Sequence, residues 1–411
     1  MSLTVIKSRI GREIIRDRVA ITSNYAAAYA AKDAEVDVVA AYPITPQTPA
    51  VEKMAEFIAN GELSAEYIPV ESEHSALSAL IGASAAGARV FTATSSQGLL
   101  YMFELLYIAS GLRLPIVMGL ATRAVSAPIS IHGDYQDFAA TRDSGWVIMI
   151  ASSAQEVYDS IIMAYRIAED NRVLLPVMVS YDGFLMSHTT EPVELYDADT
   201  IRGFAPKRLN RPILDSSKPI TMGAMAVPEW YYEIKYQLIE AMHNSMGVIR
   251  EVHDAFNRTF SRNYRLVEGY MLDDADYAVI AYGGIWGNVK RAVNEARKRG
   301  IKAGALRLRL FRPFPTDELI EMISDMKTVA VIDRAVSPGA AIEGPVAMEV
   351  ATALHSRGLS TPVVSVVHGL GQRTVYSRDV AKLIKIINDS QPWDLTKSTM
   401  YMGVREYGNE G

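Results

Sequence analysis

Cysteine is absent from the 411-residue sequence. Its absence excludes disulfide bonds, a cysteine nucleophile, and cysteine-ligated zinc or iron–sulfur clusters within this chain. Seven histidines are present, but no two have the His-x-x-x-His spacing of a helical metal site. We therefore predict no metal site in this chain, and any redox cofactor that needs thiolate ligands must lie on another chain.

Long hydrophobic runs and a strong charge imbalance are also lacking. No uncharged run reaches the roughly 18 residues that a transmembrane helix needs, and residues 1–18 mix basic and acidic side chains without the apolar region of a signal peptide. The 41 basic and 47 acidic side chains give a net charge of -6, which indicates neither nucleic-acid nor membrane binding. No Walker A or GxGxxG motif is present. We expect a cytoplasmic protein.

The composition is that of a globular protein, with 49% hydrophobic and 21% charged residues, and the length suggests two or three domains. From residue 20 to 182, short β-branched runs alternate with helical patterns, which predicts a parallel sheet covered on both faces. The expected strands are 36–41, 67–70, 89–94, 114–121, 147–152 and 173–180, and the expected helices are 48–60, 72–88, 98–110 and 155–169.

A change of pattern divides the chain. Residues 189–228 are polar and proline-rich, which predicts an extended excursion over the surface. One long amphipathic helix is expected from Trp230 to about Arg262, and a second α/β unit from about Asp276, with Thr316 as the N-cap of one of its helices. We predict domains at 1–255 and 256–395, followed by a tail at 396–411.

Four polar clusters follow predicted strands or begin predicted helices. Thr45 lies between two prolines in Tyr42–Pro46, so its hydroxyl is held rigidly where ligands bind a parallel sheet, although a stiff turn explains the same residues. Glu71–Ser75 combines two acids with a histidine at a helix start, where a desolvated carboxyl would have a raised pKa. From the spacing alone, an ordinary charged helix N-terminus is the favoured explanation.

The other two clusters follow the next two strands. Thr94–Gly98 offers hydroxyls and backbone amides to a heterocycle or an anion, although turn chemistry alone also explains it. Arg123 follows a buried strand and is suited to pair with a carboxylate, or else to form a surface salt bridge. The polar run His132–Asp137 is expected to be a loop near the same edge.

Taken in this order, the clusters resemble the alpha chain of the pyruvate:ferredoxin oxidoreductase (pyruvate synthase) family of 2-oxoacid oxidoreductases. The resemblance extends from about Asn24 to about Arg378. Its most specific stretches are Tyr42–Pro46, Glu71–Gly98 and Arg113–Trp146. The second unit also resembles the family's second domain, through Leu306–Pro315 and Asp333–Gly339.

The resemblance implies a thiamine-diphosphate-binding, pyrimidine-type parallel-sheet domain followed by a transketolase-C-terminal-like α/β domain. It also implies oxidative decarboxylation of a 2-oxoacid, with the acyl group passed to coenzyme A and electrons to ferredoxin. The thiamine diphosphate would be shared with a partner chain, and Mg²⁺ and [4Fe-4S] clusters would lie on partner chains. The implied partners are a beta subunit that carries the diphosphate site and a cluster, a cysteine-rich ferredoxin-like delta subunit, and a gamma subunit.

Residue roles follow from the same resemblance. Glu73 matches the carboxyl that hydrogen-bonds the aminopyrimidine ring and so favours the imino tautomer, whose nitrogen takes the thiazolium proton. Thr45 and Arg123 match the substrate-contacting threonine and arginine, while Thr94 and Gln97 are expected on the edge that the cofactor lines.

An uncharged Thr45 favours a small acyl group, and therefore pyruvate. The run Gly133–Gln136 is a place where more variation is expected, so chain-length preference stays open. Other 2-oxoacids (2-oxobutyrate, branched-chain, 2-oxoglutarate or oxalate) remain alternatives, as does a non-catalytic scaffold that binds coenzyme A or a partner.

Overall fold

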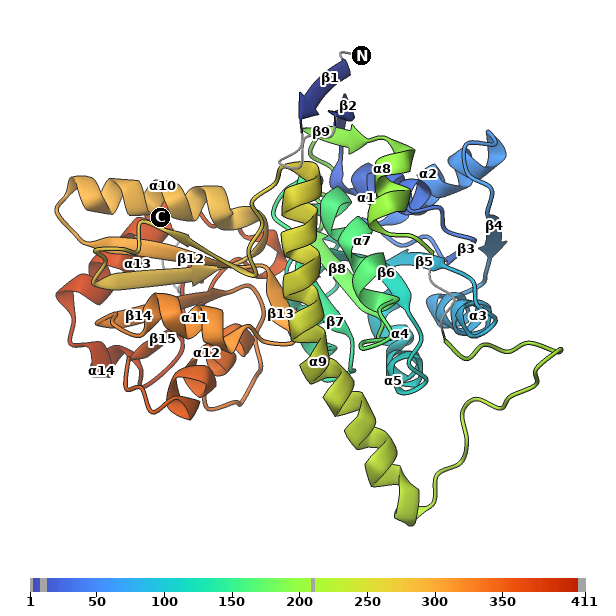
Figure 1. Ribbon diagram of the computed structural model, residues 1–411. Coiled ribbons are helices and arrows are strands. Elements are labelled where there is room, and N and C mark those ends of the chain that lie inside the picture. Colours follow the sequence, from blue (N-terminus) through green and yellow to red (C-terminus); the bar gives the residue numbers. More distant parts are fainter. Residues whose placement is uncertain (1–2, 8–12, 208–210, 406–411) are drawn as a thin grey trace.

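The computed structural model describes residues 3–7, 13–207 and 211–405, which form two α/β units side by side (Figure 1). The first unit contains a seven-stranded sheet in the order β13-β7-β8-β6-β5-β3-β4. Its strands are β3 (Val38–Ala41), β4 (Glu66–Pro69), β5 (Val90–Thr94), β6 (Ile116–Thr122), β7 (Val147–Ile150), β8 (Val177–Asp182) and β13 (Leu310–Arg312). All pairings are parallel except that of β13 with β7, so the predicted parallel sheet is confirmed.

Helices of the first unit connect these strands. They are α1 (Ser23–Asp33), α2 (Thr48–Ala59), α3 (Glu73–Ala85), α4 (Ser96–Tyr101), α5 (Phe103–Gly111), α6 (Gln136–Ala140), α7 (Ala154–Ala168), α8 (Ala198–Phe204) and α9 (Pro228–Phe260). Every residue of β5, β6, β7 and β8 is buried, as expected for strands covered on both faces. Their carboxyl ends therefore point to one edge of a rigid layer.

The second unit has a six-stranded sheet in the order β10-β12-β11-β14-β15-β16, with only β10 antiparallel. Its strands are β10 (Val267–Tyr270), β11 (Tyr277–Ala281), β12 (Ala303–Leu308), β14 (Thr328–Asp333), β15 (Val363–Val367) and β16 (Met400–Tyr401). Its helices are η1 (Gly283–Ile285), α10 (Trp286–Lys298), α11 (Thr316–Ile323), α12 (Pro345–Ser356), η2 (Leu370–Gln372), α13 (Ser377–Asp389) and α14 (Pro392–Leu395).

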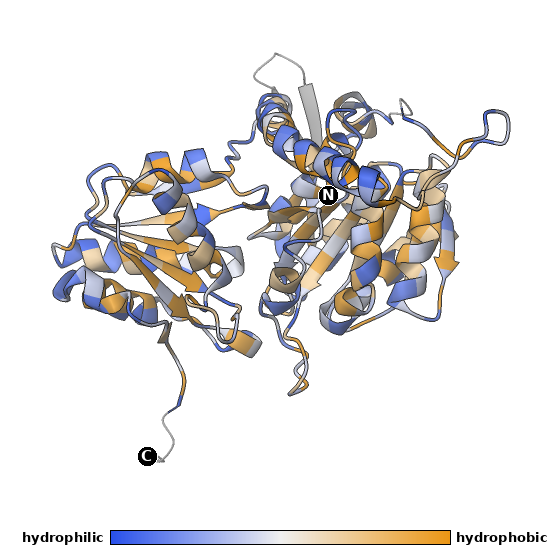
Figure 2. Cartoon of the chain, turned by 90° about the horizontal axis from the view of Figure 1, so that it is seen from below, coloured by the Kyte–Doolittle hydropathy of each residue, from blue (hydrophilic) through white to orange (hydrophobic). Residues whose placement is uncertain are grey.

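Alternation along β11 shows how this sheet is buried. Ala278 and Ile280 belong to a large apolar core that continues into the first unit, whereas Val279 and Ala281 face a separate core with α10 and α13. Successive strand residues point to opposite faces, so both faces of the sheet are covered. Figure 2 shows the hydrophobic colour concentrated on the strands of both units.

Three sequence predictions were wrong in detail. The expected excursion at 189–228 begins with β9 (Glu191–Tyr196), which pairs antiparallel with β2 (Glu13–Ile21) beside β1 (Leu3–Lys7), and continues into α8. The single helix expected at 98–110 is divided at Met102 into α4 and α5. Pro315, not Thr316, is the N-cap of α11.

The predicted domain limits at 255 and 395 stay a prediction. Strand β13 lies in the sheet of the first unit although it follows β12 of the second, and β16, within the expected tail, pairs with β15. The two units are thus interleaved through the chain.

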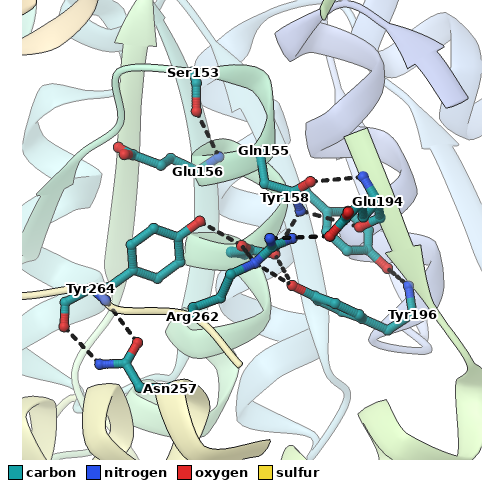
Figure 3. A network of polar contacts seen from close by, with 10 residues as sticks. Ser153, Gln155, Glu156, Tyr158, Glu194, Tyr196, Asn257, Arg262 and Tyr264 are labelled. Carbon is teal, nitrogen blue, oxygen red and sulfur yellow. Dashed lines mark hydrogen bonds and ion pairs between the residues drawn. The ribbon is translucent and has the colours of Figure 1, made fainter. Parts of the chain in front are cut away.

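A polar network fixes the turn from α9 into the second unit (Figure 3). Arg262 donates to the carboxylate of Asp159 at 3.1 Å and to the hydroxyl of Tyr196 at 2.9 Å. Tyr264 donates to the same carboxylate at 2.6 Å, and Asn257 exchanges two 2.8 Å hydrogen bonds with the backbone of Tyr264. Because Asp159 lies on α7, this network anchors the connection to the first unit.

Candidate active site

The predicted site residues lie at the carboxyl ends of three neighbouring strands. Thr45 follows β3, Thr94 ends β5, and Arg123 follows β6. Strand β5 pairs with both β3 and β6 in parallel. In open parallel sheets this edge is where ligands bind, so the fold brings residues far apart in the sequence to one edge.

Glu73 opens α3 with its side chain largely buried. Ser72 is the N-cap, and its hydroxyl accepts a hydrogen bond from the backbone N–H of Ser75 at 3.1 Å. This cap starts the helix so that Glu73 lies in its first turn, 7% exposed. Burial raises the pKa of the Glu73 carboxyl and outweighs a backbone hydrogen bond that lowers it. Glu73 is therefore more than an exposed helix-capping charge.

Gly98 brings the Glu73 carboxyl close to the loop after β5. A β-carbon at position 98 would lie 2.6 Å from Glu73 Oε1 and 2.6 Å from Thr94 Oγ1. Any residue other than glycine would force the Glu73 or Thr94 side chain to move, because real β-carbons do not lie this close to another atom. The structure therefore brings Glu73 and Thr94 together, and Gly98 is the residue that makes room for them.

Three buried polar atoms at this place lack a partner among the described residues. They are the hydroxyl oxygens of Thr94 and Ser95 and the amide nitrogen of Gln97. Buried polar groups are rarely left unpaired, because each costs about 1–3 kcal/mol. A heterocycle with ring nitrogens and an amino group, such as the thiamine pyrimidine, would satisfy these atoms together with Glu73. The residues present therefore fit the pyrimidine half of the cofactor.

Arg123 and Thr45 form the second part of the site. The guanidinium of Arg123 donates from Nη1 to the backbone carbonyl of Thr45 at 2.8 Å and from Nε to that of Ser130 at 2.8 Å. Arg123 is 6% exposed, and burial lowers its pKa. Both hydrogen-bond acceptors are neutral carbonyls, and among the described residues Arg123 does not form the surface salt bridge considered from the sequence.

Thr45 itself is exposed, while the next residue anchors its loop. The carbonyl of Pro46 accepts a hydrogen bond at 2.7 Å from the amide of Asn24, which is buried on α1. The Thr45 side chain is thus presented from a loop tied at Pro46 and at the Arg123 contact. The hydroxyl remains accessible to a ligand.

Sequence reasoning missed one buried carboxylate at this edge. Asp137 lies in the polar run that was expected to be a loop, yet it is completely buried and hydrogen-bonded to the backbone of Ser96 and Arg123. No local pattern marks it, because Asp137 stands between polar Gln136 and apolar Phe138. Such a residue is recognised only once the two distant backbone segments are seen together.

The described residues contain no helix long and apolar enough to cross a membrane. Within the same residues no group of three or more His, Asp or Glu side chains is arranged to hold a metal ion.

The fold and the family model together define a chain of the thiamine-diphosphate-binding class, with the buried Glu73 carboxyl at the edge of its parallel sheet. Residues 29–254 match the sequence model of the pyruvate flavodoxin/ferredoxin oxidoreductase thiamine-diphosphate-binding domain, and residues 275–380 match core domain II of pyruvate:ferredoxin oxidoreductase. The chain belongs to the pyruvate flavodoxin/ferredoxin oxidoreductase family. The resemblance and fold class predicted from the sequence are confirmed.

Curated relatives agree over nearly the whole length. Pyruvate synthase subunit PorA of Methanocaldococcus jannaschii is 48% identical, with 94% of this chain and 98% of the relative covered. PorA of Thermotoga maritima is 45% identical, with coverages of 96% and 100%. Ketoisovalerate oxidoreductase subunit VorA of Pyrococcus horikoshii is 46% identical, with coverages of 88% and 91%.

A solved structure shares the fold. A 2-oxoglutarate:ferredoxin oxidoreductase from Magnetococcus marinus, solved with 2-oxoglutarate, coenzyme A and succinyl-CoA, gives a TM-score of 0.68 at 17% identity. The match covers 90% of this chain and 65% of that chain, so this chain spans about two thirds of the solved one. At this identity the likeness supports the fold alone.

Proposed function

We propose that this chain is the alpha subunit of a cytoplasmic pyruvate:ferredoxin oxidoreductase. The complex converts pyruvate and coenzyme A to acetyl-CoA and CO₂, and passes two electrons to ferredoxin. The observation that carries the proposal is the buried Glu73 carboxyl, held against Thr94 and Gly98 at the sheet edge. The near-full-length relatives named pyruvate synthase subunit PorA support the substrate.

Glu73 has the role of binding and orienting the cofactor. When bound, thiamine diphosphate supplies the carbon nucleophile and the electron sink for decarboxylation. A carboxyl with a raised pKa retains a proton more readily, so Glu73 can share one with a nitrogen of the pyrimidine ring. The unpaired atoms of Thr94 and Gln97 would add hydrogen bonds to the same ring.

Arg123 and Thr45 have the role of binding the substrate. Arg123 uses Nε and Nη1 for backbone carbonyls, and its Nη2 takes no part in either bond. A guanidinium so fixed can pair with a carboxylate without first losing rotational freedom. The exposed hydroxyl of Thr45 can donate to a substrate oxygen, and its lack of charge suits a monocarboxylate.

An exposed aromatic surface beside Glu73 supports a partner chain that completes the site. It consists of Tyr101, Phe103, Tyr107 and Ile108, which are 61%, 36%, 37% and 43% exposed. The ring of Tyr101 lies 5.9 Å from that of His74, the residue after Glu73. Contiguous apolar patches of this kind mark protein interfaces.

The chemistry missing from this chain indicates what its partners carry. Without cysteine it cannot ligate iron–sulfur clusters, so we assign the [4Fe-4S] clusters, like the Mg²⁺–diphosphate site, to other chains. A beta subunit would carry the diphosphate site and a cluster, and a cysteine-rich delta subunit would relay electrons to ferredoxin. A gamma subunit completes the assembly.

Substitution of Glu73 tests the proposal. In the assembled complex, Glu73→Gln should abolish pyruvate-dependent reduction of methyl viologen and weaken thiamine diphosphate binding measured by calorimetry. Glu71→Gln is the matched control, because Glu71 is an exposed carboxyl two residues away whose side chain accepts a hydrogen bond from the Ser75 hydroxyl. Wild-type turnover in Glu73→Gln would overturn the assignment.

A branched-chain 2-oxoacid is the second candidate substrate. The identity to the ketoisovalerate subunit, 46%, falls between those to the two pyruvate synthase subunits. Turnover of pyruvate, 2-oxobutyrate, 2-oxoisovalerate and 2-oxoglutarate by the complex would decide between them. A scaffold without catalysis would bind no thiamine diphosphate and turn over none of the four.

A further inference from the structure

Asp137 is a buried carboxylate at the edge of the candidate site. It lies in α6 and has no exposed surface. Its Oδ2 atom accepts hydrogen bonds from the backbone N–H of Ser96 and from that of Arg123, each at 2.9 Å. Its Oδ1 atom accepts from the backbone N–H of Phe138 at 2.8 Å. One oxygen therefore joins two segments that are distant in the sequence.

Each of these segments carries one part of the site. Ser96 lies between Thr94 and Gly98, the two residues that meet the Glu73 carboxyl. Arg123 reaches across to the carbonyl of Thr45. The oxygen shared by the two N–H groups thus fixes the cofactor-facing loop after β5 relative to the substrate-facing loop after β6.

The backbone at Ser96 indicates why such a fixed point is needed. Ser96 has a φ angle of +47°, in the left-handed region that costs a non-glycine residue about 1 kcal/mol or more. Its N–H is held by Asp137, and its hydroxyl donates to the carbonyl of Ala124 at 2.5 Å. The first bond leads to α6 and the second to the loop after β6, so the segments that follow β6 stabilise the strained turn.

The second unit supports the segment that carries Asp137. The side chain of Gln136 donates to the carbonyl of Val336 at 3.0 Å and accepts from the N–H of Val336 at 2.9 Å. The N–H of Tyr135 donates to the carbonyl of Arg334 at 2.8 Å. The segment that carries Asp137 is therefore hydrogen-bonded to the second unit, which keeps the Asp137 carboxylate in a fixed position.

We propose that Asp137 is a positioning residue that holds the Arg123 loop in register with the Thr94–Gly98 loop. The substrate carboxylate on Arg123 then lies at the correct distance from the cofactor beside Glu73. The inference rests on the proposed function, because it concerns the same site. Misplacement of reacting groups by about 1 Å costs on the order of 100-fold in rate.

Paired substitutions in the assembled complex test this role. Asp137→Ala removes both inter-loop hydrogen bonds and should lower kcat for the preferred 2-oxoacid by about 100-fold. Asp137→Asn keeps one oxygen that can accept from both N–H groups, so it should recover a large part of kcat. Calorimetry on the same preparations should show thiamine diphosphate affinity changed far less than kcat, because Glu73 is untouched.

Asp159→Asn is the control for loss of a buried carboxylate. Asp159 is also completely buried, but it bonds Arg262 and Tyr264 at the turn after α9, away from the sheet edge. The Asp159→Asn variant should have a lower thermal unfolding temperature, with kcat and KM near those of the wild type. A purely structural role for Asp137 predicts the same behaviour for both variants.

The outcomes separate the two levels of the proposal. A wild-type complex inactive with every 2-oxoacid would overturn the proposed function. An active wild type with unchanged kcat in Asp137→Ala, or with an equal loss in Asp159→Asn, would overturn only the positioning role. If Asp137→Ala fails to assemble, Asp137→Asn decides: a kcat lowered several-fold at nearly unchanged cofactor affinity supports the role, and a kcat equal to that of the wild type rejects it.

Discussion

Arg334 and Asp182 form a completely buried ion pair between the two units. Asp182 ends β8 of the first sheet, and Arg334 follows β14 of the second. The same carboxylate accepts from the hydroxyl of Tyr135 and the N–H of Gly284, each at 2.7 Å. Because charges are costly to bury singly, this pair specifies how the two units dock.

Replacing Arg334 should therefore destabilise the chain. In Arg334→Met the Asp182 carboxylate keeps two hydrogen-bond donors but loses its counter-charge, which costs about 3–5 kcal/mol. Differential scanning calorimetry of the complex should show a transition lowered by several degrees. The control is Arg202→Met, whose pair with Glu35 is about half exposed and is worth at most about 1 kcal/mol. Equal shifts in both variants would contradict the prediction.

Gly98→Ala tests the close approach at the cofactor site. A β-carbon there would lie 2.6 Å from both the Glu73 carboxyl and the Thr94 hydroxyl, so one of them must move. Thiamine diphosphate affinity should fall by at least 10-fold in calorimetry while assembly persists. Gly82→Ala is the control, since it lies on α3 with nothing within 4 Å of the added carbon. That change should leave affinity unchanged and stabilise the helix by up to about 1 kcal/mol.

The core of this fold could be predicted from the sequence, and its cross-connections could not. Buried strands such as β6 are continuous apolar runs. The order of strands and helices along the chain can therefore be predicted from local sequence patterns. Strand β13 is different: it continues the alternating pattern of β12 after Arg309 but pairs with β7 in the other sheet. Which sheet a strand joins depends on tertiary packing, and no local sequence pattern indicates it.

The site shows the same division. Thr45 and Arg123 could be assigned to one edge because parallel strands share a carboxyl end. Their contact runs through the backbone carbonyl of Thr45, which no side-chain pattern predicts. Asp137 was read as part of a polar loop, since a sequence does not reveal that distant N–H groups satisfy a buried carboxylate.

Asp333 should make stability depend on pH. Burial raises its pKa from 3.8 to about 7, against hydrogen bonds from Val346, Ala347 and Tyr282 that lower it. The folded chain therefore keeps a proton that the unfolded chain loses between about pH 4 and 7. Stability from this group is highest below pH 4, falls as the pH rises to about 7, and is constant above.

Asp333→Asn isolates this contribution. The amide does not titrate, so the difference in unfolding temperature between wild type and variant should be larger at pH 5 than at pH 8. Other buried acids, including Asp159, titrate in both proteins and cancel in the difference. A difference that stays constant across this range would show that Asp333 keeps an ordinary pKa.

Arg123→Ala should impair substrate use more than cofactor binding. Loss of a charge-assisted hydrogen bond to the substrate carboxylate costs about 1.5–3 kcal/mol, which corresponds to a fall of about 10- to 100-fold in kcat/KM. Arg291→Ala removes a guanidinium that is 73% exposed on α10 and should have no effect. Viologen reduction over a range of pyruvate concentrations gives kcat/KM for both variants. An unchanged kcat/KM in Arg123→Ala would remove this residue from the site.

The aromatic surface beside α3 should be the place where the cofactor-sharing partner binds. Tyr101→Glu puts a charge into this patch, where burial against a partner would require its desolvation, so the complex should dissociate at least 10-fold more readily. Trp393→Glu is matched in exposure, at 60% against 61%, but lies on α14 of the second unit. Size-exclusion chromatography with mass spectrometry would show which chain is lost. Retention of the thiamine-binding partner by Tyr101→Glu at wild-type affinity would place that interface elsewhere.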